Sequence, residues 1–82
     1  MQYYKNMASV DKLIKKMKNQ PNGIRFEDAQ RVLGAKGYLF DRQRGSHCHF
    51  VNETGDVITI VKDDTIKKVY VSAILERIGE TN

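Results

Sequence analysis

The chain has 82 residues, a formal net charge of +4 and 40% hydrophobic residues, which is enough for one small domain with its own core. Its single cysteine excludes an internal disulfide and a zinc site of several thiolates. No apolar run approaches the roughly 18–20 residues of a membrane span, and no signal-peptide core follows Met1. These features predict a soluble, single-domain protein of the reducing cytoplasm, without a membrane partner.

The excess positive charge is concentrated at the N-terminal end. Residues 1–20 contain five lysines and one acidic residue, whereas residues 21–82 contain nine basic and nine acidic residues. A basic chain favours a polyanionic partner. Because residues 21–82 are neutral overall, a site for such a partner in that part needs a local basic cluster.

Two helices are predicted in the N-terminal half. The first has apolar residues at the spacing of one helix face: Val10, Leu13, Ile14 and Met17. Ser9 is its expected N-cap, since residues 1–8 show no period, and the Pro21–Gly23 break ends it. A second helix is expected over residues 26–36. Gly34 lies inside it at a cost of up to about 1 kcal/mol relative to alanine, so we expect close packing there.

Three strands are predicted next, over residues 38–44, 46–52 and 56–62, with breaks at Gly45 and at the turn over residues 53–55. Apolar residues at helical spacing then predict a last helix over residues 69–78. The resulting order is α, α, β, β, β, α. It predicts an α+β fold in which helices cover one face of a three-stranded antiparallel sheet and leave the other face open.

The second predicted strand has two different faces. Side chains alternate along a strand, so Phe50 facing the helices carries Cys48 inward as a core residue. The same alternation turns His47 and His49 toward the open face. Two histidines at this spacing lack a third ligand in the sequence, so no metal site is predicted.

The open face therefore combines groups that suit chemistry on a phosphate. Histidine transfers protons near neutral pH, and Arg42 and Arg44, just before the second strand, can each bind a phosphate through two hydrogen bonds. Lys67 and Lys68 precede the last helix, whose N-terminus attracts anions. Residue types alone leave the alternative open that these four basic residues are an ordinary solvated surface.

Residues 45–50, Gly-Ser-His-Cys-His-Phe, resemble the Gly-Ser/Thr-His-x-x-Phe signature of the HicA toxins, the ribonuclease half of a bacterial toxin–antitoxin pair. The resemblance runs in consistent order from Ile24 to Gly79. It includes five further segments: residues 26–33, 36–38, 42–44, 57–60 and 66–68. The chain departs from the family pattern at Val61, where a proline is common, and at Cys48, where a second histidine is common.

The resemblance implies a fold related to double-stranded RNA-binding domains over residues 24–82, preceded over residues 1–23 by an extension that carries the basic amphipathic helix. Members cleave mRNA without a metal or other cofactor, and a HicB-type antitoxin blocks their active site. The motif histidine, His47, is the implied catalytic residue, and no DNA binding is expected from the toxin alone. The expected RNA-binding residues are Arg42, Arg44, Ser46, His49, Lys67 and Lys68.

Two other functions remain open at this point. One is a non-catalytic RNA-binding module with the same fold, which would bind RNA and leave it intact. The other is an interaction protein whose basic N-terminal helix docks on an acidic polypeptide. Incubation of labelled RNA without metal separates an enzyme from the first alternative, and the absence of RNA affinity at physiological salt identifies the second.

Overall fold

The computed structural model of the chain describes residues 2–80, with side chains described for residues 10–80. The elements are α1 (Gln2–Asn19), α2 (Phe26–Ala35), β1 (Leu39–Arg44), β2 (His47–Val51), β3 (Val57–Val61) and α3 (Lys68–Arg77). The strands form one antiparallel sheet in the order β1-β2-β3. This order confirms the predicted α+β fold of the double-stranded RNA-binding-domain type. No helix in the described part of the chain is long and apolar enough to cross a membrane.

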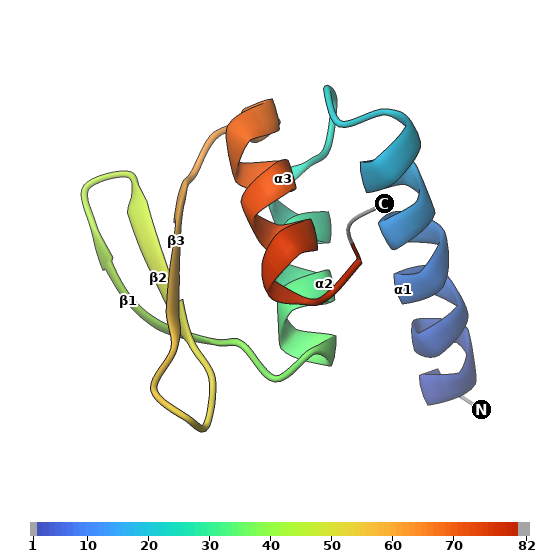
Figure 1. Cartoon of the computed structure of the whole chain (residues 1–82), viewed down its shortest axis with the longest axis horizontal. Helices are drawn as coiled ribbons and strands as arrows, with labels where there is room; N and C mark the ends of the chain where they lie inside the picture. Colours follow the sequence, from blue (N-terminus) through green and yellow to red (C-terminus); the bar gives the residue numbers. More distant parts are fainter. Residues whose placement is uncertain (1, 81–82) are drawn as a thin grey trace.

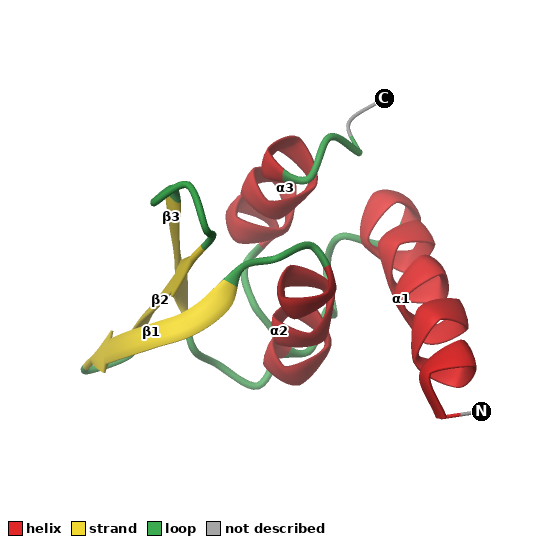
Figure 2. Ribbon diagram, turned by 90° about the horizontal axis from the view of Figure 1, so that it is seen from below, coloured by secondary structure: helices red, strands yellow, loops and turns green. Residues whose placement is uncertain are grey.

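The elements form three layers (Figure 1). Helices α2 and α3 lie side by side against one face of the sheet, and α1 packs against these two helices from the other side, as Figure 2 shows from below. Within residues 2–80, no helix covers the opposite face of the sheet. That open face is the surface on which the sequence places both histidines.

The core follows the predicted apolar stripes. Its sheet side consists of Cys48, Phe50, Ile58 and Ile60, and its helix side includes Phe26, Val32, Leu33, Val71 and Ile74. The stripe of α1 is buried at Val10, Ile14 and Met17, which extends the core into the third layer. Burial of one such apolar side chain contributes about 1.5–3 kcal/mol, so these stripes hold the layers together.

Two details of the helices differ from expectation. Helix α1 begins at Gln2, so the prediction that Ser9 is its N-cap was wrong. Residues 2–8 contain neither glycine nor proline, and nothing in them stops a helix. The expected close packing at Gly34 was also wrong, because this residue is exposed and a Cβ built on it meets no atom within 4 Å.

Gly37 ends α2 as the sequence predicts. Its φ is +89°, a backbone conformation that glycine adopts with little strain. The Tyr38 N–H donates to the Leu33 carbonyl at 2.8 Å and the Gly37 N–H donates to the Gly34 carbonyl at 3.1 Å, the pattern of a Schellman motif. This cap turns the chain from α2 directly into β1.

A polar cluster ties α3 to the loop between β2 and β3. The Tyr38 hydroxyl donates to Asp56 Oδ2 at 2.6 Å, and Arg77 Nη1 donates to the same oxygen at 2.7 Å and to the Val57 carbonyl at 3.0 Å. The hydrogen bond from Tyr38, assisted by the charge of Arg77, lowers the pKa of Asp56 below its usual value. Just after the C-terminal end of α3, Glu80 pairs with Lys18 of α1 at 2.8 Å, and this contact lowers the pKa of the Glu80 carboxyl.

We expect the substitution Gly34→Ala to stabilise the protein. Glycine inside a helix costs about 0.5–1 kcal/mol relative to alanine, and at this exposed position the added methyl group meets open space. Urea denaturation should show a higher free energy of unfolding with an unchanged slope. The control Gly37→Ala should be destabilising, because alanine is strained at a φ of +89°. A loss of stability in Gly34→Ala would contradict this description of the helix.

We expect Asp56 to contribute to acid denaturation. Because its pKa is lower in the folded chain, its carboxylate stabilises the fold above the unfolded pKa of about 4 and loses this effect as the pH falls through the folded pKa. In Asp56→Asn, stability at pH 7 should be lower and should fall less steeply below about pH 4. Urea denaturation at several pH values measures this, with Asp64→Asn in the exposed loop as the control. Equal acid dependence in Asp56→Asn and the unchanged protein would refute the prediction.

Candidate active site on the open face of the sheet

The orientation of β2 decides which side chains reach the open face. Cys48 and Phe50 are buried against the helices, as predicted, while His47 is exposed and His49 is half-buried on the opposite face. Strand alternation accounts for this arrangement, because the burial of Phe50 forces its neighbours on the strand outward. The two histidines therefore lie next to each other on the same surface.

Strand pairing extends each histidine into a row across the sheet. Arg44, His47 and Val61 are direct partners on β1, β2 and β3, and Arg42, His49 and Thr59 are direct partners in the neighbouring row. Cβ atoms of such partners lie about 4.5–5.5 Å apart. We call these six residues the histidine rows. They bring the two predicted arginines beside the two predicted histidines.

A β-bulge at Asp41 makes this arrangement possible. Phe40 pairs with Phe50, whereas the next pair is Arg42 with His49, so Asp41 has no partner on β2. The extra residue reverses the alternation of β1. As a result, Phe40 lies beside Phe50 on the helix side, while Arg42 joins the histidines on the open face. In a regular strand Phe40 and Arg42 would share one face. The sequence did not predict the bulge.

The turn between β1 and β2 sets Arg44 directly opposite His47. It has two residues, Gly45 with a φ of +56° and Ser46 with a negative φ, as in the type II′ turns that join hairpin strands. Ser46, predicted to begin the second strand, is instead exposed in the turn, because the strand begins only after the glycine has reversed the chain. Its carbonyl accepts a hydrogen bond from the Lys62 N–H at 2.7 Å.

Polar contacts distinguish the two histidine rows. Arg42 Nη1 donates to Asp41 Oδ2 at 2.9 Å, whereas Arg44 makes no ion pair with the residues that the structure describes. His49 Nδ1 lies 2.8 Å from Thr59 Oγ1. The ring of His47 has no hydrogen-bond partner among residues 10–80, and the residue is exposed.

Lys67 and Lys68 lie apart from these rows. Lys67 is the N-cap of α3 and Lys68 its first residue, and both are exposed. Helix α3 covers the inner face of the sheet (Figure 1), and the two lysines belong to its N-terminal end and not to a strand. They follow the end of β3 at which Val61 pairs with His47. The structure thus gathers Arg42, Arg44 and the histidines, whereas both lysines lie outside these rows, at the start of α3.

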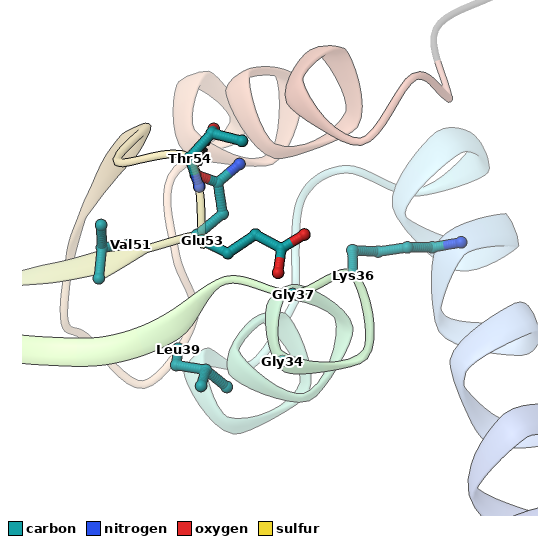
Figure 3. A pocket seen from close by; sticks show the side chains of 8 residues that line it. Gly34, Lys36, Gly37, Leu39, Val51, Glu53 and Thr54 are labelled. Carbon is teal, nitrogen blue, oxygen red and sulfur yellow. Dashed lines mark hydrogen bonds between the residues drawn. The ribbon is translucent and has the colours of Figure 1, made fainter.

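The other end of the open face is apolar. Leu39, Val51 and Val57 are direct partners across the three strands, and we call them the apolar row. Leu39 is 64% exposed and Val57 is 43% exposed. A hollow next to Leu39 and Val51 is bordered by the C-terminal end of α2 and by the loop after β2 (Figure 3). It does not include either histidine, so the candidate chemistry lies on the open sheet and not in this hollow.

Metal ligands are not grouped in this part of the molecule. Among the described residues, no three His, Cys, Asp or Glu side chains lie close enough together to hold a metal ion. The chemistry that the histidine rows themselves offer is proton transfer by imidazole next to two guanidinium groups that can bind an anion.

A family model described as the HicA toxin of bacterial toxin–antitoxin systems matches residues 26–80. The match begins with α2, covers the whole sheet and α3, and leaves α1 outside. It confirms the resemblance that the sequence motif indicates. No curated protein and no solved structure matches the chain.

Proposed function

The chain belongs to the family of HicA toxins of bacterial toxin–antitoxin pairs, and from this premise we propose that it is a metal-independent endoribonuclease that cleaves mRNA by histidine acid–base catalysis. Residues 24–82 form the ribonuclease domain and residues 1–23 form an extension. The observation that carries the proposal is the position of His47, exposed on the open face directly opposite Arg44. The proposal assigns the enzyme to the cytoplasm, where its mRNA substrate is found.

The chemistry uses the nucleophile that RNA itself contains. The 2′-hydroxyl attacks the neighbouring phosphorus, the P–O5′ bond breaks, and the products are a 2′,3′-cyclic phosphate and a 5′-hydroxyl. His47 either removes the proton of the 2′-hydroxyl or protonates the leaving 5′-oxygen. The guanidinium groups of Arg42 and Arg44 bind the non-bridging oxygens and stabilise the charge that develops on them.

RNA binding in this proposal depends on local basic groups. Residues 21–82 have no excess charge, so the affinity comes from Arg42 and Arg44 with contributions from Ser46 and His49. Lys67 and Lys68 bind phosphates of the same RNA strand where it passes the N-terminal end of α3. Contacts of this kind read charge and shape, so we expect little base preference.

The antitoxin partner of this toxin, in our proposal of the HicB type, covers the open face. An exposed apolar patch beside a polar site is the usual composition of a protein interface. The apolar row lies on the same face as the histidine rows, so one protein seated on it also blocks His47. Leu39, 64% exposed, is the most accessible residue of that row.

We expect His47→Ala to lose ribonuclease activity without unfolding. Removal of a proton-transfer group lowers the rate by about 100-fold or more, and the side chain of His47 is exposed and supports no packing. The measurement is cleavage of labelled RNA without added metal, together with growth arrest on expression. Gln30→Ala, an exposed change on α2, is the control.

Two results would count against the enzyme. Undiminished cleavage by His47→Ala would refute the catalytic assignment. If the unchanged protein binds RNA with a steep salt dependence and leaves it intact, the chain is instead the non-catalytic RNA-binding module.

We expect Leu39→Ser to weaken antitoxin binding by about tenfold or more, because a leucine that is buried only in the complex contributes about 1.5–3 kcal/mol. Val69→Ser is the matched control, since Val69 is 65% exposed but lies on α3, away from the open face. Titration calorimetry with a HicB-type antitoxin that binds the unchanged protein measures both affinities. Equal affinities of the two variants would show that the antitoxin does not seat on the apolar row.

A further inference from the structure

The second histidine of the open face has a partner that the first one lacks. His49 Nδ1 lies 2.8 Å from Thr59 Oγ1, a residue of β3 that strand pairing sets directly opposite His49. His49 is half-buried between Arg42 on one side and Thr59 on the other. This contact orients the imidazole by tying its Nδ1 to β3.

The spacing of the two histidines suits one phosphate group. They are two residues apart on the same face of β2, and a rise of about 3.3 Å per residue separates their Cα atoms by roughly 6.6 Å. Arg44 and Arg42 stand opposite them in the same order. A phosphate bound by both arginines thus lies beside both imidazoles.

We propose that His49 is a second catalytic residue of this ribonuclease and that Thr59 is its positioning residue. The inference rests on the function proposed above and adds the missing half of the proton transfer. As the O2′–P bond forms, one histidine takes the proton of the 2′-hydroxyl. As the P–O5′ bond breaks, the other histidine gives its proton to O5′. The pair ends with its protonation states exchanged, and solvent restores them.

The contact with Thr59 determines which ring nitrogen of His49 transfers the proton. When Nδ1–H of His49 donates to Thr59 Oγ1, Nε2 is left as the nitrogen that exchanges a proton with the substrate. The Thr59 hydroxyl can accept this hydrogen bond whether His49 is neutral or charged, so the ring keeps its orientation through the reaction. The charged or titratable neighbours of His49 on the open face are Arg42 with its partner Asp41 on β1, Arg44 at the diagonal position, and His47 on β2; Thr59 on β3 is uncharged.

The test uses the full chain and a short RNA whose cleaved linkage has been mapped with the unchanged protein. A second substrate carries sulfur in place of the bridging 5′-oxygen at that linkage, because a thiolate leaves without needing a proton. The variants are His47→Ala, His49→Ala, Thr59→Val and Thr59→Ser, each checked for an unchanged thermal unfolding transition. The readouts are kcat, KM and the pH dependence of kcat/KM.

The proposal predicts that His49→Ala lowers kcat on the ordinary RNA by about 100-fold or more, and that the sulfur substrate restores only one of the two histidine variants, the one that lacks the acid. The bell-shaped pH profile of the unchanged protein should become one-sided in His49→Ala. Thr59→Val should lower kcat roughly tenfold with little change in KM, an effect of the size of one lost hydrogen bond. Thr59→Ser, which keeps the hydroxyl, should retain activity.

Several results would overturn the proposal. One is full activity of His49→Ala with a bell-shaped profile, and another is a rise in its KM alone, which would make His49 a binding residue. Restoration of both histidine variants, or of neither, would also exclude paired proton transfer. Undiminished activity of His47→Ala is a different result, because it would refute the proposed function, on which the role of His49 rests. If His49→Ala fails to fold, the comparison of Thr59→Val with Thr59→Ser decides: equal activities overturn the positioning role.

Discussion

Phe50 is completely buried, with its ring centroid 6.3 Å from that of Phe26 in α2 and 5.9 Å from that of Phe40 in β1. This contact fixes the face that β2 presents to the helices. Because side chains alternate along a strand, a slip of one residue would bury His47 and His49 and expose Phe50. The cost of burying two imidazoles and exposing a phenyl ring, several kcal/mol in total, makes that register inaccessible. The packing of one aromatic residue thereby orients the proposed catalytic groups.

The features that depend on local pattern could be predicted from the sequence. The apolar stripe from Val10 to Met17 predicts the buried face of α1, and Gly37 predicts the end of α2. The alternation around Phe50 predicts which face of β2 is buried. The structure contains all three features. The features that depend on a partner strand could not be predicted. Nothing in the residues around Asp41 distinguishes a bulge from a regular strand, since the bulge exists only relative to the pairing with β2.

The residues of the candidate site also fall into those that local pattern predicts and those that depend on the pairing of strands. The sequence placed His47 and His49 on one face, and the motif around them indicated the toxin family, which the family match confirms and composition could not identify. Thr59 gave no signal in the sequence, because its contact with His49 arises only after the loop between β2 and β3 sets their register. The family resemblance included Lys67 and Lys68 in the expected RNA-binding set, but the chain crosses to the helix layer before it reaches them. A co-linear motif gives the order of residues along the chain and does not show which of them share a surface.

The outer position of α1 separates the net charge of the protein from its open sheet. Lys12, Lys15 and Lys16 are exposed on this helix, and the layer of α2 and α3 stands between it and the sheet. A helix with its side chains is about 10 Å thick, whereas the Debye length at physiological ionic strength is about 8 Å. The lysines of α1 are thus largely screened from the open face. The two sides of this small molecule act as electrostatically independent surfaces. The net positive charge of the chain belongs to the side formed by α1, and it says little about the side that carries the histidines.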